Sequence, residues 1–223
     1  GKRMNVDSLE QARFNMVQQQ IRPWEVLDQR VLDLINQIPR DQFVPEAYRG
    51  LAYADIEVPI GHGQQMMFPR VEARLLQSLD VKPNDKILEI GSGSGYLTAC
   101  LANLGGQVTS LDIHEDFTGA VRARLDAQGI GNVELRTADG LAGEIAGGPF
   151  DVIAVTGSLP EVPDALKQQL TIGGRLFAVT GEAPAMEASL ITRVGEDAWR
   201  SEGLFETELA ALENAARTER FQF

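Results

Sequence analysis

A glycine-rich turn between a predicted strand and a predicted helix carries the first residues that could bind a ligand. The sequence EIGSGSGY occupies residues 89–96, where Gly91, Gly93 and Gly95 alternate after the acid Glu89. Glycine lets the backbone turn sharply and approach a ligand without the clash of a Cβ atom. The spacing differs from the GxGxxG of a dinucleotide site, and no Lys-Ser/Thr pair follows as in a P-loop. A carboxylate at this position favours a cationic ligand over a phosphate.

Two more acids follow the next two predicted strands. Asp112 lies at the end of the strand predicted over residues 107–113, and Asp139, followed by Gly140, ends the strand predicted over 132–139. The carboxyl ends of parallel strands meet at one edge of a sheet, where a carboxylate can hold the two hydroxyls of a ribose. Asp112 suits that role, and Asp139 could accept a bond from the exocyclic amine of adenine. Each feature alone has a purely structural alternative, a tight turn or a helix N-cap, but three acids at successive strand ends indicate a nucleoside site.

The segment GHGQQMMFPR, residues 61–70, is a third candidate site. It is too rich in glycine and proline for the interior of a regular element, and too apolar for an idle surface loop. Its run of methionine and phenylalanine could line a pocket, or it could simply anchor the loop in the core, which is the commoner fate of such clusters. We expect His62 to have a structural role and assign it no proton transfer.

The glycine turn and the three strand-end acids together resemble the class I S-adenosylmethionine-dependent methyltransferases. The resemblance implies that the glycine turn carries the methionine part of the cofactor, that Asp112 holds the ribose and that Asp139 meets the adenine. The sulfonium and ammonium charges of S-adenosylmethionine suit an acidic pocket. The cofactor-binding residues implied are Gln64, Glu89, Gly91, Ser92, Gly93, Gly95, Asp112, Ile113, Asp139 and Gly140.

A longer run of motifs resembles the protein-L-isoaspartate O-methyltransferases. This family transfers a methyl group to the abnormal carboxylate of L-isoaspartyl residues, so the resemblance implies a protein or peptide carboxylate as the acceptor. The resemblance covers most of residues 16–180. It includes MVQQQI (16–21), DQRVLDLI (28–35), PRDQFVP (39–45), AYADIEVPIGHGQ (52–64), ILEIGSGSGYLTA (87–99) and FDVIAVTGSLPEVPDALKQQLTIGGRL (150–176).

The acceptor loop departs from the pattern of this family. After Gly-His-Gly-Gln the family usually continues Thr-Ile-Ser, whereas this chain has Gln65, Met66 and Met67. The resemblance places Gln65 and Met67 at the positions of the two acceptor-site hydroxyls, which makes them the candidate catalytic positions. Methionine has no proton to donate, and an apolar pocket suits an unidentified small molecule better than a peptide. Three alternatives stay open: isoaspartyl repair, a methyltransferase with a more apolar acceptor, and a non-catalytic protein that binds S-adenosylmethionine.

Apolar periodicity predicts the elements that position these residues. After residue 82 short apolar runs alternate with amphipathic stretches, which is typical of a parallel sheet covered by helices. Residues 40–69, punctuated by prolines, are expected to be irregular. We expect helices over 6–21, 27–38, 71–81, 96–105, 115–129 and 162–170, strands over 86–91, 107–113, 132–139, 150–157 and 173–181, and an antiparallel hairpin over 189–207.

The predicted fold class is α/β, a Rossmann-like doubly wound fold. Its sheet is expected to be mostly parallel and seven-stranded, with an antiparallel edge hairpin and an N-terminal helical extension. Residues 1–80 are expected to supply the N-terminal helices and the acceptor loop. They would pack on a methyltransferase core of residues 81–223, as one structural domain overall.

Composition argues against several classes of function. The 223 residues carry a net charge of −12 without a basic run, which argues against a nucleic-acid partner. No apolar run approaches the ~20 residues of a membrane helix, and the N-terminus lacks the apolar segment of a signal peptide. The single cysteine, Cys100, is expected to be a buried hydrophobe, and a reducing, cytoplasmic compartment follows. With His62 and His114 as the only histidines, we expect no metal site, and the oligomeric state is not predicted.

Overall fold

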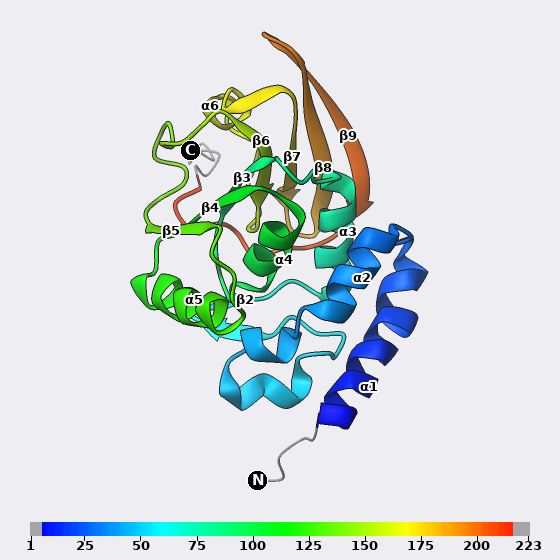
Figure 1. The fold of residues 1–223 in the computed structure, drawn as a ribbon. Helices are drawn as coiled ribbons and strands as arrows, with labels where there is room; N and C mark the ends of the chain where they lie inside the picture. Colours follow the sequence, from blue (N-terminus) through cyan, green and yellow to red (C-terminus); the bar gives the residue numbers. More distant parts are fainter. Residues whose placement is uncertain (1–5, 216–223) are drawn as a thin grey trace, which may run out of the picture.

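The computed structural model describes residues 6–215, and a seven-stranded sheet lies at their centre (Figure 1). Its strands are β3 (Lys86–Ile90), β4 (Gln107–Asp112), β5 (Val133–Thr137), β6 (Phe150–Val155), β7 (Leu170–Glu182), β8 (Ala185–Gly195) and β9 (Ala198–Glu206). Their spatial order is β5-β4-β3-β6-β7-β8-β9. The first five strands pair in parallel, and β8 and β9 pair antiparallel at the edge, which confirms the predicted fold class and hairpin.

The chain order creates a switch point between β3 and β6. From β3 the chain moves outward to β4 and β5 through α4 (Tyr96–Leu104) and α5 (Glu115–Ala127), and then returns to β6 on the other side of β3. The loops after β3 and β6 therefore leave the sheet in opposite directions. In open α/β sheets such a point opens a crevice at the carboxyl edge, where ligands bind.

Alternate side chains of the strands enter two apolar clusters, one on each face of the sheet. Ile87 of β3 belongs to the larger cluster with α3 (Pro69–Leu79), α4 and α5, whereas its neighbour Leu88 belongs to the smaller one. The larger cluster extends from Met16 to Ala188. This continuity supports our proposal that the N-terminal helices and the core form one structural domain, although residues 1–5 and 216–223 of the two predicted parts lie outside the described residues.

The smaller cluster is covered by loops and by α6, which is shorter than predicted. The helix expected over 162–170 is only Asp164–Lys167. The residues that follow are needed by the sheet, because Leu170 starts β7 in register with Phe150 and the carbonyl of Gln169 accepts the amide of Phe150. Pairing with β6 therefore overrides the helical periodicity of the sequence.

The N-terminal part contains more regular structure than expected. Helix α1 (Val6–Met16) continues into a π-helical turn, and α2 (Gln29–Gln37) is capped by Asp28, whose side chain accepts the amide of Arg30. Short elements lie in the stretch 40–69, which was expected to be irregular. Because 3₁₀ turns and two-residue strands are too short to show periodicity, the sequence gives no sign of them. They are two 3₁₀ helices (Arg40–Phe43 and Glu46–Leu51) and the hairpin of β1 (Pro59–Gly61) and β2 (Gln64–Gln65). Within residues 6–215, no helix combines the length and the apolar character needed to cross a membrane.

A buried ion pair ties the segment that carries this hairpin to α3. Arg40 is fully buried, and its guanidinium donates to the carbonyls of Ala52 at 2.6 Å and Met67 at 3.1 Å. It also lies 2.7 Å from a carboxylate oxygen of Glu72, whose pKa burial raises and the guanidinium lowers. A buried charge is tolerated only when it is paired and hydrogen-bonded. One guanidinium therefore fixes both ends of the segment 52–67.

Replacing Arg40 with methionine is expected to lower the free energy of unfolding by about 3–5 kcal/mol, because Glu72 would be left buried without its partner. Urea denaturation measures this change. The double variant Arg40→Met/Glu72→Met should recover part of the loss. As a matched control, Lys82→Met removes an exposed ion pair with Asp80 and should change stability by less than about 1 kcal/mol. An equally small effect for Arg40→Met would contradict the role given to the buried pair.

Candidate functional site

A cavity of about 840 Å³, including its open mouth, lies at the carboxyl edge of the sheet. Its walls come from the hairpin β1–β2, from the loops after β3, β4, β5 and β6, and from the residues that follow β9. The cavity therefore occupies the switch point between β3 and β6. Its position and size are those of a small-molecule site in an open α/β sheet.

The structure brings together all the site residues predicted from the sequence except one. Gly95 is not on the wall of the cavity: it precedes α4 with φ of 88°, and a Cβ atom there would lie 2.8 Å from Val121 of α5. A glycine is required at position 95 because a side chain there would clash with α5. The predicted residues on the wall are Gln64, Gln65, Met67, Glu89, Gly91, Ser92, Gly93, Asp112, Ile113, Asp139 and Gly140.

The glycine turn is held from two sides. Gly91 has φ of 95°, and a Cβ atom there would lie 2.2 Å from the hydroxyl of Thr156, so no larger residue fits. That hydroxyl lies 2.7 Å from the carbonyl oxygen of Gly91 and joins the turn to the end of β6. On the other side, the amide of Gly93 donates to the carboxylate of Asp112 at 3.0 Å. The turn is therefore a fixed backbone surface at the floor of the cavity.

Asp112 is held in one orientation by backbone amides. One carboxylate oxygen accepts the amide of Gly93 and the other accepts that of His114, both at 3.0 Å. The side chain is buried at the end of β4 and lies on the cavity wall. Each oxygen keeps a further lone pair, so the carboxylate can still accept from two hydroxyl groups of a ligand.

Glu89 presents an unpaired carboxylate oxygen at the inner end of the cavity. Its Oε1 accepts the hydroxyls of Thr98 and Ser110, the latter at 2.6 Å. Its Oε2 is buried and has no hydrogen-bond partner among the described residues. Burial raises the pKa of Glu89 to about 8, against the lowering effect of the two hydroxyls. Because a buried unpaired oxygen is costly, this atom suits a cationic ligand that enters the cavity.

Apart from His114, the other ionisable residues on the wall are also acidic. The carboxylates of Glu72, Glu89, Asp112, Asp139 and Glu213 line the cavity, whereas none of its described lining residues is lysine or arginine. Asp139 also accepts the amide of Leu141 at 2.9 Å, so it is a turn aspartate as well as a wall residue. This concentration of carboxylates favours a positively charged ligand and disfavours a phosphate.

The hairpin β1–β2 forms the wall opposite the glycine turn. Gly61, His62 and Gly63 turn it with three successive positive φ angles of 105°, 54° and 70°. Beyond the turn, Met66 and Met67 are 95% buried, belong to the larger apolar cluster and also line the cavity. Both interpretations of this apolar run therefore apply, since the two methionines pack in the core and also form part of the wall.

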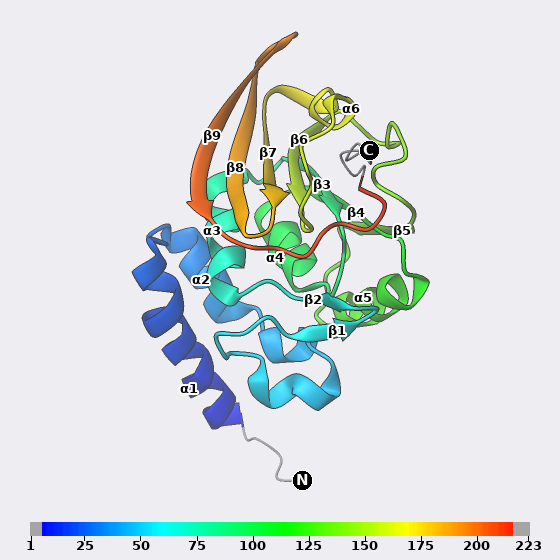
Figure 2. The same cartoon turned by 180° about the vertical axis from the view of Figure 1, so that it is seen from behind.

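The sequence did not point to the segment after β9, residues 207–215, which runs across the carboxyl ends of the strands (Figure 2). It pairs with the loop after β6, where the amide of Leu212 donates to the carbonyl of Ser158 at 2.9 Å. Its Glu213 accepts the side-chain amide of Gln64 and bonds to the ring of His114, each at 2.8 Å. The one local signal is Gly157, where a Cβ atom would lie 2.8 Å from the backbone of Leu212.

Known proteins are similar in sequence to this chain over most of its length. A family model described as protein-L-isoaspartate(D-aspartate) O-methyltransferase matches residues 11–207. The chain is 40% identical over 201 residues to protein-L-isoaspartate O-methyltransferase 1 of Rhodopseudomonas palustris strain HaA2, covering 90% of this chain and 82% of the relative. It is 41% identical over 192 residues to the protein-L-isoaspartate O-methyltransferase of Syntrophus aciditrophicus strain SB, covering 86% and 88%.

A solved structure shares the fold. It is a candidate protein-L-isoaspartate O-methyltransferase from Plasmodium falciparum in complex with S-adenosyl-L-homocysteine, with a TM-score of 0.75 and 23% identity over 92% of this chain and 98% of that one. The acidic cavity, its glycine floor and the unpaired oxygen of Glu89 fit the cationic cofactor of such enzymes. The chain belongs to the protein-L-isoaspartate(D-aspartate) O-methyltransferase family of S-adenosylmethionine-dependent methyltransferases.

Proposed function

We propose that this protein methylates the carboxylate of L-isoaspartyl residues in damaged proteins or peptides. The observation that carries the proposal is the cavity itself, in which an acidic inner end faces the hairpin that carries Gln64 and Gln65. Its relatives that are named isoaspartyl methyltransferases cover nearly the whole chain and so support the same acceptor. When bound, S-adenosylmethionine supplies an electrophilic methyl group on a sulfonium.

The residues of the cavity would hold the cofactor by its charges and its hydroxyl groups. Oε2 of Glu89 would accept the ammonium group, and Asp112 the ribose hydroxyls. Asp139 would accept the adenine amine, beside Gly140 and Ile113. The glycine turn allows the ligand to lie against the backbone. These roles use the free lone pairs of carboxylates that the protein already fixes in orientation.

Transfer to a carboxylate needs positioning more than acid or base catalysis. The acceptor carboxylate is already ionised at neutral pH and the leaving group departs neutral, so in-line orientation can supply much of the rate. Gln65 is exposed at the hairpin, and its side-chain amide is a hydrogen-bond donor at the position of the first hydroxyl of the family pattern. We assign it the orienting role. The buried side chain of Met67 would exclude water from the donor end.

A second candidate function rests on the methionines. Met66 and Met67 give the donor end of the cavity an apolar wall where the family pattern has hydroxyls. Such a wall favours a small, more apolar acceptor over an isoaspartyl peptide. The third alternative, a protein that binds the cofactor without turnover, keeps the same cavity and loses only the acceptor chemistry.

We also propose a cytoplasmic location. The single cysteine, Cys100, is free and buried inside α4, and burial raises the pKa of its thiol, so it is neither a disulfide partner nor an activated nucleophile. A net charge of −12 and the acidic cavity argue against a nucleic-acid partner.

Asp112→Ala is expected to weaken binding of S-adenosylhomocysteine by about 1–3 kcal/mol. The ribose would lose its acceptor, and the amide of Gly93 in the glycine turn would lose the carboxylate to which it donates. Isothermal titration calorimetry measures the affinity. Asp151→Ala is the matched control, since Asp151 also accepts a backbone amide, that of Lys86, but lies at the opposite edge of the sheet. Equal affinity in the Asp112 variant and the control would show that the ribose lies elsewhere.

Cofactor binding at pH 7 is expected to release nearly one proton from Glu89. With its pKa raised to about 8, Glu89 is protonated in the free protein at pH 7, and an ammonium group beside Oε2 would favour the ionised form. The proton count comes from calorimetry with S-adenosylhomocysteine in buffers of different ionisation enthalpy. Glu89→Gln should bind more weakly and release no proton from this position. Unchanged proton release in that variant would contradict the pairing.

The raised pKa of Glu89 also determines how the free energy of unfolding changes with pH. The pKa of a glutamate in the unfolded chain is near 4.5, whereas the pKa of folded Glu89 is about 8. Between these values the folded state binds more protons than the unfolded state. The contribution of Glu89 to the free energy of unfolding is therefore complete below pH 4.5 and falls as pH rises through this window.

The double substitution Gln65→Thr/Met67→Ser separates the candidate functions. It restores the two hydroxyls of the family pattern, and we expect methyl transfer to an isoaspartyl peptide to rise at least about tenfold, within the range that orientation can supply. Transfer from labelled S-adenosylmethionine measures the rate, with an aspartyl peptide of the same sequence as the control. Measurable wild-type activity supports the repair function. Absence of turnover in both forms at saturating cofactor would reject it.

A further inference from the structure

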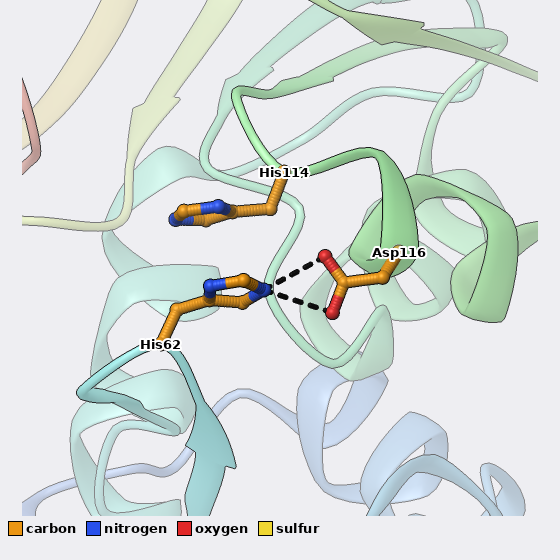
Figure 3. A group of neighbouring side chains, drawn as sticks. All are labelled: His62, His114 and Asp116. Atoms are coloured by element: carbon orange, nitrogen blue, oxygen red, sulfur yellow. Dashed lines mark hydrogen bonds and ion pairs between the residues drawn. The ribbon is translucent and has the colours of Figure 1, made fainter.

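The only two histidines of the chain lie against each other (Figure 3), and His114 also lines the cavity. His62 is at the tip of the hairpin β1–β2, and His114 immediately precedes α5. Their rings are stacked, with centroids 3.8 Å apart and planes 11° from parallel. Asp116, in the first turn of α5, directs both carboxylate oxygens at Nε2 of His62, at 2.8 and 2.9 Å. Two elements far apart in the sequence thus bring two imidazoles and a carboxylate together.

These three side chains are the ligand types that zinc and related ions use. One ligand atom from each of His62, His114 and Asp116 lies within 4.8 Å of the other two. Ligands of tetrahedral zinc, at ~2.0–2.1 Å from the ion, lie about 3.3 Å from one another. The spacing of the three ligand atoms is therefore within about 1.5 Å of the spacing that a metal centre needs.

His114 also has the partner that commonly orients a metal-binding histidine. Oε1 of Glu213 lies 2.8 Å from its Nε2, which leaves Nδ1 as the ring atom available to an ion. A carboxylate on the second ring nitrogen fixes the orientation of the imidazole and raises its basicity as a ligand. The carboxylates of Glu115, Asp116 and Glu213 also offset the positive end of the α5 dipole, which alone would disfavour a cation here.

The ligands have room to close around an ion. Stacked rings direct their lone pairs side by side, so His62 must tilt for both rings to bind one metal. Its side chain is 41% exposed and that of Asp116 is 65% exposed. His62 lies between Gly61 and Gly63, and apart from the chain neighbours of Gly63 no described residue has an atom within 4 Å of where its Cβ would be. A tilt of the His62 ring would change its contacts with His114 and Phe117, and there is open space on the side of Gly63.

We infer that His62, His114 and Asp116 form a binding site for a divalent transition-metal ion of the zinc class. Glu213 holds His114 in place, and water completes the coordination. A metal bound here joins the tip of the hairpin β1–β2 to the start of α5, and so fixes one wall of the cavity to the element that follows Asp112. This site uses residues outside the cofactor contacts assigned above.

The test uses the full chain, treated with a chelator and then titrated with Zn²⁺ by calorimetry. One Zn²⁺ per chain is expected to bind. Because the chain has two histidines, nitrogen-15 spectra of the imidazoles contain two sets of ring signals, and both should shift at one equivalent of zinc. His62→Ala and His114→Ala should each lower the zinc affinity at least about tenfold.

Two further variants separate the site from a general effect of charge or folding. Asp116→Asn keeps the size of the side chain and leaves the sequence of the hairpin unchanged. It should also lower the zinc affinity at least about tenfold. Glu115→Gln removes a neighbouring acid of the same helix turn that is outside the ligand group, and it should change the affinity less than about threefold. Zinc affinity that survives in His62→Ala, His114→Ala and Asp116→Asn, or ring signals that do not move, would overturn the inference.

Discussion

The buried guanidinium of Arg40 is the interaction on which the shape of the site depends. It binds the carbonyls of Ala52 and Met67, and it pairs with Glu72 of α3. The hairpin β1–β2 lies in the chain between those two carbonyls, so both of its ends are fixed to the helix that packs on the sheet. Glu72 itself reaches the cavity wall. A single paired charge in the core thus fixes both ends of the segment that carries the acceptor loop.

The acidic wall of the cavity favours a cationic ligand. Glu89 is buried with one oxygen unpaired, and burial holds its pKa near 8. The neighbouring carboxylates on the wall disfavour an anionic acceptor, and the positive charge of a bound cofactor would offset them.

The sequence predicts those parts of the site that have a local signal. Alternating glycines after a predicted strand and acids at predicted strand ends mark Gly91, Asp112 and Asp139 without knowledge of the fold. It does not predict contacts between distant segments. Glu213 reaches Gln64 only because the residues after β9 cross the sheet edge, and His62 meets His114 only because the hairpin lies over α5. The shortened α6 has the same origin, since strand pairing overrides a helical pattern that the sequence shows clearly.

In the divergent loop, the conformation of the backbone does not depend on the chemistry of the side chains. The amide of Met66 donates to the carbonyl of Val58, and the carbonyl of Met67 accepts from Arg40, so main-chain bonds hold the loop. These bonds do not depend on which side chain stands at positions 65–67. The methionines are buried in the larger apolar cluster and line the cavity, and the glutamine stays exposed. A family member can therefore exchange hydroxyls for apolar groups here and keep its fold and cofactor cavity, because the loop is anchored through its backbone.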